Sequence, residues 1–210
     1  MALLAGGCSG HSGKGKSKDP GTGVTASEVC DGAFDTSAAE ALRRLAGTDT
    51  FDESGGSNAA AESPTFSLEN AVRQLHDSYE KRSACWVYKS GDDSGEPLLE
   101  IRFLASRTHP SSPKKQSGST SSTYPLGLYA RVGPNGADLF FRCPTEAPSR
   151  DAFIGDTKYV KGELFSPAGK MRGDNVDKDR MEILNSVSRK VAQTADCVSE
   201  AGLPADVPSR

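Results

Sequence analysis

The sequence has no long apolar run, few histidines and almost no net charge, and each shortage excludes a class of protein. No stretch approaches the roughly 18 apolar residues of a membrane-spanning helix, so membrane attachment would require a lipid. The 25 basic and 28 acidic residues nearly cancel, which gives no electrostatic argument for nucleic-acid binding. Three histidines leave few candidates for a catalytic base.

The scarcity of histidine also argues against a protease function for one segment that resembles a protease motif. Ser90–Pro97 looks like the G-D-S-G-G-P string around the serine of chymotrypsin-like proteases, with an inserted Asp and with Glu in place of Gly. Such an enzyme needs a histidine near its serine. His11 and His109 lie in low-complexity segments, and His76 lies beside the apolar stripe of an expected helix. Turn residues between two strands explain Ser90–Pro97 more simply.

Two motifs that suggest a cofactor or metal lack the context they need. Gly10–Ser17 matches the P-loop pattern, but Asp19-Pro20-Gly21 follows it where a helix should begin. Asp174, Asp177 and Asp179 lack the spacing of a calcium loop, and acids in a first helical turn are explained by the helix dipole. We therefore expect no cofactor, no metal ligands and no catalytic residues.

Five cysteines form no C-x-x-C pair. Apart from Cys8 the count is even, which in an exported chain indicates two disulfides among Cys30, Cys85, Cys143 and Cys197. In the cytosol the same four would be free thiols. Three connectivities are possible. The pairing of Cys30 with Cys85 and of Cys143 with Cys197 is favoured, because each bridge then joins segments about 55 residues apart and ties a helix-bearing half to a strand.

The first residues carry a further motif. Leu3-Leu4-Ala5-Gly6-Gly7-Cys8-Ser9-Gly10 resembles the lipobox of bacterial lipoproteins, in which the cysteine receives a diacylglycerol and becomes the mature N-terminus. The resemblance implies lipid attachment at Cys8 and a location at the extracellular face of the cell membrane, or secretion. Only Met1 to Leu4 stand before Ala5, which is too few for the basic and apolar regions of a signal peptide, so the signal peptide either begins upstream or has been trimmed. The alternative is a chance cysteine in a glycine-rich tail.

Composition divides the chain into three parts. Residues 1–28 hold the lipobox-like start and a flexible tether rich in Gly, Ser, Lys and Thr. Residues 29–204 are long enough for a single domain with its own core, and 205–210 form a tail. The tether lysines, Lys14, Lys16 and Lys18, would lie near anionic lipid head groups or serve only as solubilising charges.

Periodicity predicts helices and strands within the domain. The expected helices follow Asp35 or Ser37 and stop at Gly47, run from Ser67 with an apolar stripe reaching Tyr79, and extend from Asp174–Asp179 to Gly202. Residues 48–65 and 106–125 are expected to be loops. Alternating apolar residues predict five strands: Ala84–Tyr88, Leu98–Ala105, Leu126–Val132, Ala137–Cys143 and Lys158–Phe165.

These elements predict an α+β fold, with an antiparallel sheet of about five strands covered by helices on one face and a long C-terminal helix. The Cys-Asp-Gly-Ala start at Cys30–Ala33, the Phe-Arg-Cys strand end at Phe141–Cys143, and Cys197 followed by Gly202-Leu203-Pro204 are similar to motifs in small exported lipoproteins of actinobacteria, which are largely uncharacterised. The resemblance implies an exported α+β domain, with the Mog1/PsbP-like sandwich as an analogy, and implies no activity.

Three functions remain open at this point. The first is a non-catalytic cell-envelope lipoprotein that binds the membrane through its lipid and holds an unknown envelope protein or small ligand. The second is a secreted hydrolase that uses surface carboxylates, for which Glu100, Asp138 and Glu163 are the strand-borne candidates. The third is a module that associates with polyanions or the cell wall through the tether lysines and Lys114-Lys115.

Overall fold

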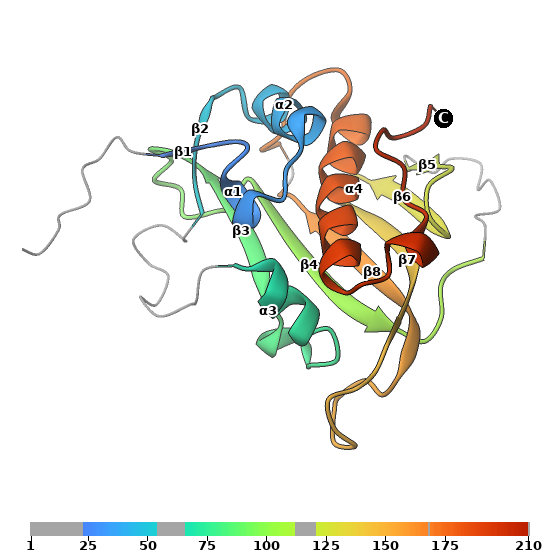
Figure 1. The fold of residues 1–210 in the computed structure, drawn as a ribbon. Helices are drawn as coiled ribbons and strands as arrows, with labels where there is room; N and C mark the ends of the chain where they lie inside the picture. The colour runs from blue at the N-terminus through green and yellow to red at the C-terminus, as the bar shows by residue number, and fades with distance from the viewer. Residues whose placement is uncertain (1–22, 54–65, 112–120, 168, 210) are drawn as a thin grey trace, which may run out of the picture.

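The computed structural model describes residues 23–53, 66–111, 121–167 and 169–209. Cys8, the tether lysines and Lys114-Lys115 lie outside these ranges. The described residues form an eight-stranded antiparallel sheet in the order β1-β2-β3-β4-β8-β7-β6-β5 (Figure 1). Its strands are β1 Val24–Thr25, β2 Thr50–Asp52, β3 Ala84–Lys89, β4 Leu99–Ser106, β5 Ser122–Tyr124, β6 Tyr129–Gly133, β7 Gly136–Thr145 and β8 Thr157–Phe165.

The expected five-stranded sheet is therefore wrong in strand number. Strands β3, β4, β6, β7 and β8 occupy the predicted segments, whereas β1, β2 and β5 fall in stretches predicted to be tether or loop. Each of these three has only two or three residues, which is too short for an alternating pattern. They form because the backbone of a longer neighbour offers pairing partners, as Lys89 does for Phe51.

The sheet order places β8 between β4 and β7, although β4 and β8 are far apart in the chain. Strands β5 to β8 run as consecutive antiparallel neighbours, and β8 then pairs along its length with β4. The predicted turn at Gly133–Gly136 joins β6 to β7. Gly136 is required there, because an added Cβ would lie 2.1 Å from the carbonyl oxygen of Leu164.

The helices are short except for α4. They are α1 Val29–Gly32, α2 Thr36–Ala46, α3 Leu68–Arg73, the 3-10 turn η1 Tyr79–Lys81, α4 Val176–Thr194 and α5 Val198–Ala201. Local signals explain α2, since the Asp35 carboxylate accepts from the Ala38 N–H at 3.0 Å and Gly47 ends the helix at φ 69°. The predicted C-terminal helix is interrupted instead at Asp196, which has φ 56°.

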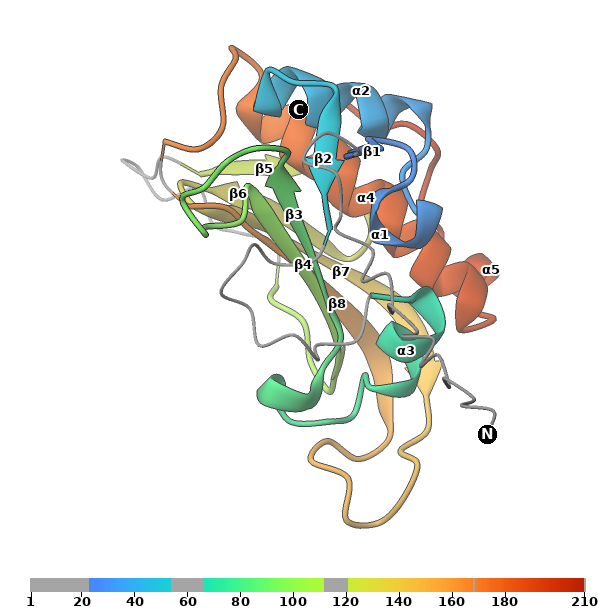
Figure 2. The ribbon, with the colours of Figure 1, turned by 90° about the vertical axis from the view of Figure 1, so that its left-hand side faces the viewer.

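The core lies between one face of the sheet and α4. Alternate residues of β4, among them Ile101 and Phe103, are buried against this helix layer. Gly162 in β8 permits close packing, because a Cβ there would lie 2.9 Å from Phe103 Cε1 and 3.1 Å from Leu184 Cδ1. Figure 2 shows α2 and α4 side by side on this face of the sheet.

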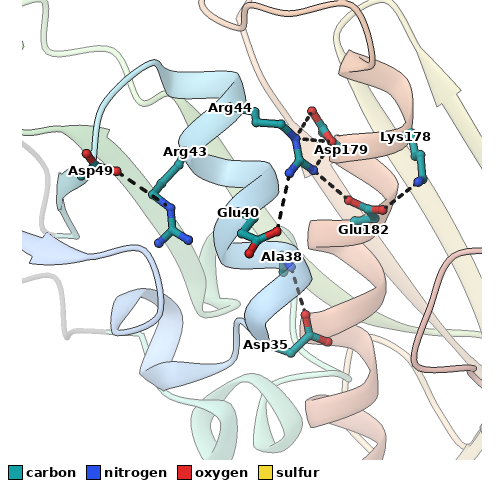
Figure 3. A network of polar contacts seen from close by, with 9 residues as sticks. All are labelled: Asp35, Ala38, Glu40, Arg43, Arg44, Asp49, Lys178, Asp179 and Glu182. Atoms are coloured by element: carbon teal, nitrogen blue, oxygen red, sulfur yellow. Dashed lines mark hydrogen bonds and ion pairs between the residues drawn. The ribbon is translucent and has the colours of Figure 1, made fainter.

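A charged network joins α2 to α4 (Figure 3). Arg44 Nη2 lies 2.6 Å from Asp179 Oδ1 and 3.2 Å from Glu182 Oε2, and Glu40 lies at 4.0 Å from the guanidinium. The Asp179 side chain is 5% exposed, whereas that of Arg44 is 49% exposed. The hydrogen bond to Asp179 raises the pKa of Arg44 above its ordinary value. This arginine therefore compensates a carboxylate that is shielded from water.

Two disulfides tie the helices to the sheet. Cys30 before α2 is bonded to Cys85 in β3, and Cys143 in β7 is bonded to Cys197 before α5, with Cα–Cα distances of 5.4 and 5.3 Å. This is the connectivity that the sequence favours. Such bridges indicate an oxidising, extracytoplasmic environment. Among the described residues, none of the helices has both the length and the apolarity needed to cross a bilayer.

Candidate binding site on the open face of the sheet

We call the face of the sheet opposite α4 the open face. Its central row contains Arg131, Asp138, Glu163 and Arg102, which are successive neighbours across β6, β7, β8 and β4. They point away from the core because the alternate positions of these strands are buried beneath α4. Two carboxylates are thus flanked by two arginines in the middle of the sheet.

Lys161 joins the two carboxylates. Its Nζ lies 2.9 Å from Asp138 Oδ1 and also contacts Glu163 Oε1. Burial is the largest single influence and would lower the pKa of Lys161, but hydrogen bonds to both carboxylates, together with charge attraction to them, raise this pKa above its ordinary value. The lysine therefore stays protonated and holds the two carboxylates together.

Arg102 holds an aromatic residue on the open face. It forms an ion pair with Glu100 on its own strand, and its guanidinium lies 4.3 Å from the ring centroid of Tyr79 and 5.8 Å from that of Trp86. The same side chain donates to the carbonyl oxygens of Tyr79 and Arg82, at 3.2 and 3.3 Å. These contacts fix η1 beside β4.

A groove of about 600 Å³ lies over this part of the open face. Tyr79 and Phe165 line it and are 52% and 49% exposed, although large aromatic side chains usually bury most of their surface. The remaining lining includes Glu100, Arg131, Asp138, Glu163 and the β6–β7 turn Gly133–Gly136. A concave surface with aromatic walls and a few fixed polar groups is typical of ligand sites.

The turn that closes the groove is held from the core. Arg180 of α4 is buried, and its Nη1 donates to the carbonyl oxygens of Gly133 and Pro134, at 3.0 and 3.1 Å. Burial lowers the pKa of Arg180 from its ordinary value, and the nearby Asp177 acts in the opposite direction. The guanidinium thus supplies donors to carbonyl groups of the turn, and the groove wall is anchored to α4.

The structure brings the three carboxylates suggested by the sequence, Glu100, Asp138 and Glu163, to the same groove. Each is engaged by a cation, Arg102 for Glu100 and Lys161 for the other two. Sequence reasoning missed the aromatic residues. Spacing predicts Tyr79 on the apolar stripe of a helix, but α3 ends at Arg73 and Tyr79 lies in η1. For Phe165, the strand alternation could have indicated the open face.

His76 does not belong to this site. It is buried, with Nδ1 at 2.9 Å from the carbonyl oxygen of Ile154 and Nε2 at 3.0 Å from Thr145 Oγ1. These bonds hold the connection between β7 and β8, which projects from the body in Figure 1 and carries the exposed Phe153. His76 is therefore a packed structural residue.

The protease-like segment forms the turn between β3 and β4. Ser94 Oγ lies 2.7 Å from Lys170 Nζ, an arrangement that resembles a serine–lysine pair. The lysine, however, also contacts Asp92 at 3.2 Å and Glu96 at 3.7 Å, so its ammonium is paired with two carboxylates. Hydrogen bonds from Ser94 and Lys170 lower the pKa of Asp92 to about 2. These contacts pin the turn to the segment before α4.

Two groupings of possible metal ligands have other partners. Cys30, Glu53 and Cys85 bring ligand atoms within 4.8 Å of one another, but the two sulfurs are bonded to each other. The Glu53 carboxylate instead accepts from the backbone N–H of Cys30. Burial raises the pKa of Glu53, and backbone hydrogen bonds from Cys30 and Asp31 act in the opposite direction. The second grouping is the acidic cluster Asp174, Asp177 and Asp179. Of these, Asp179 is paired with Arg44 and Asp177 accepts from Ser122 Oγ.

Comparisons with known protein families, curated proteins and solved structures found no match. The resemblance to actinobacterial lipoproteins stays a prediction. The Mog1/PsbP-like analogy has no support from a solved structure, and the site is interpreted from its own chemistry.

Proposed function

We propose that this protein is a non-catalytic lipoprotein of the cell envelope that binds a ligand or partner on the open face of its sheet. The groove between Tyr79 and Phe165 carries the proposal, because both aromatic rings are half exposed beside a fixed set of paired charges. Keeping two large apolar side chains in water has no benefit for folding. A binding partner that covers them would explain their exposure.

The open face is also rigid enough to act as a preformed site. Strands β4, β8 and β7 each have a neighbouring strand on both sides. Ion pairs fix the side chains on these strands, since Arg102 binds Glu100 and Lys161 binds Asp138. A preformed site avoids the entropy cost of ordering side chains when a ligand binds. The two disulfides add to this rigidity and suit a protein that works outside the cytoplasm.

The open face is tested by photo-cross-linking in intact cells. Benzoylphenylalanine at Tyr79 or Phe165 is expected to form a specific adduct with an envelope component. The same group at Val198 of α5, an exposed apolar residue outside the groove, serves as the matched control and is expected to form none. Adducts from Val198 alone, or from none of the three positions, would contradict the proposal.

The lipid anchor at Cys8 has a separate test. The wild-type protein from its own cells is expected to partition into the detergent phase of a cloud-point separation and to incorporate an alkyne-tagged fatty acid. A Cys8→Ser variant is expected to move to the aqueous phase and to lose the label, because the acyl chains supply the membrane affinity. Equal partition of both proteins would show that Cys8 is not the anchor.

A hydrolase remains the second candidate, because the groove gathers Glu100, Asp138 and Glu163. Its carboxylates are engaged by Lys161 and Arg102, whereas an acid–base pair must be free to reach a substrate. Turnover of a wall substrate that is lost in Glu163→Gln would favour this candidate over the binding protein. The polyanion-binding module depends on lysines outside the described residues and is judged by whether salt weakens its binding.

A further inference from the structure

We infer that the ligand of the open face is a saccharide chain, an inference that rests on the proposed binding function. A sugar ring has apolar C–H faces and a rim of hydroxyl groups. It therefore needs flat apolar surfaces together with closely spaced hydrogen-bond acceptors and donors. The groove supplies both in one place.

The flat surfaces are Tyr79 and Phe165. They come from different elements, η1 and β8, and both line the groove with about half of their surface exposed. The Arg102 guanidinium lies 4.3 Å from the centroid of the Tyr79 ring, so this ring is oriented before a ligand arrives. Exposed, oriented aromatic rings offer stacking faces at a low cost in conformational entropy.

The hydrogen-bonding groups match hydroxyl groups more closely than they match an ion. Three carboxylates line the groove, and each keeps acceptor sites beyond the bond to its cation, while Arg131 and the side-chain amide of Asn135 can donate. Lys161 and Arg102 balance the carboxylate charges from within the sheet. The acceptors therefore remain in place without the strong net field that would select a cationic or anionic ligand.

A peptide fits this surface less well. An extended peptide that pairs with a sheet adds a strand to a free edge, through backbone hydrogen bonds. The groove lies over β4, β8 and β7, whose backbones are paired on both sides, so a ligand here meets side chains. Recognition by side-chain acceptors and aromatic faces favours a ligand with hydroxyl groups on a ring.

The test uses Trp86, the single tryptophan of the chain, which lies on the open face 5.8 Å from Arg102. Purified disulfide-bonded protein is titrated with chitohexaose, cellohexaose and maltohexaose, with tryptophan fluorescence and calorimetry as independent readouts. At least one of them is expected to bind saturably. Tyr79→Ala and Phe165→Ala are each expected to weaken binding at least tenfold, while Tyr79→Phe retains it. Val198→Ala, outside the groove, is expected to bind as the wild type does.

Thermal unfolding of each variant shows whether it is folded, so lost binding can be assigned to the groove. Saturable binding that Tyr79→Ala and Phe165→Ala leave unchanged would place the sugar elsewhere and overturn the inference. No binding to any of the three oligosaccharides would overturn it as well. If cross-linking at Tyr79 or Phe165 then yields a protein adduct, the proposed function stands with a protein partner. If both experiments fail, the proposed function fails too.

Discussion

The double variant Cys143→Ala/Cys197→Ala is expected to lose about 4 kcal/mol of unfolding free energy. The bridge joins residues 54 positions apart and so restricts the unfolded chain, and removing it restores entropy to the unfolded state. Alanine is preferred to serine because both sulfurs are buried and a hydroxyl would add a desolvation cost. Urea denaturation of the wild-type and variant proteins measures the difference. The expected change is a lower midpoint urea concentration, together with a steeper dependence of unfolding free energy on urea, because the unfolded chain without the bridge exposes more surface.

The other bridge is the matched comparison. Cys30 and Cys85 close a loop of 55 residues, so Cys30→Ala/Cys85→Ala is expected to lose a similar amount by the same reasoning. Both variants are made with Cys8→Ser, which prevents disulfide exchange with an unpaired thiol. A loss below about 1 kcal/mol for either variant would mean that the bridge does not constrain the unfolded chain as proposed.

Arg44→Met is expected to lower the unfolding free energy by about 3 kcal/mol, because it leaves the Asp179 carboxylate shielded from water and without its guanidinium. The expected loss lies at the lower end for a buried pair because Arg44 itself is 49% exposed, which lets water approach the gap. Chemical denaturation at neutral pH measures the effect. Adding Asp179→Asn to Arg44→Met is expected to recover part of the loss by removing the uncompensated charge.

Arg43 offers a control on the same helix (Figure 3). It lies 3.9 Å from Asp49, whose side chain is 87% exposed, so Arg43→Met is expected to change stability by less than about 0.5 kcal/mol. Equal losses for Arg43→Met and Arg44→Met would show that helix propensity or stem packing, and not the buried carboxylate, determines the effect.

Much of the fold could be predicted because its signals are local. The Asp35 cap and the Gly47 stop bound α2, and the longer strands follow the alternation read from the sequence. The short strands could not be predicted, because two or three residues carry no alternating pattern and are strands only through their pairing with a neighbouring strand. The break at Asp196 lies beside Cys197, which is bonded to β7, a constraint that helical periodicity does not contain.

The candidate site was predicted only in part. Glu100, Asp138 and Glu163 could be selected as strand-borne carboxylates, but their common location depends on β8 pairing with β4 as well as β7. Tyr79 fits a helical stripe by spacing. The chain instead leaves the helix after Arg73, and the Leu75 carbonyl accepts from the N–H of Ala105 in β4. This contact is non-local and leaves no trace in the spacing of nearby residues.

The amino-acid sequence by itself determined the longer strands, helix α2 and most of α4, the turn at Gly133–Gly136, and an even set of cysteines suited to an oxidising compartment. Those features depend on neighbours along the chain or on composition alone. The tertiary structure decided that Tyr79 and Phe165 meet over one groove and that Lys161 joins two carboxylates there. The physical reason is that the strand order and the position of η1 beside β4 depend on contacts between residues far apart in the chain, which only the folded chain establishes.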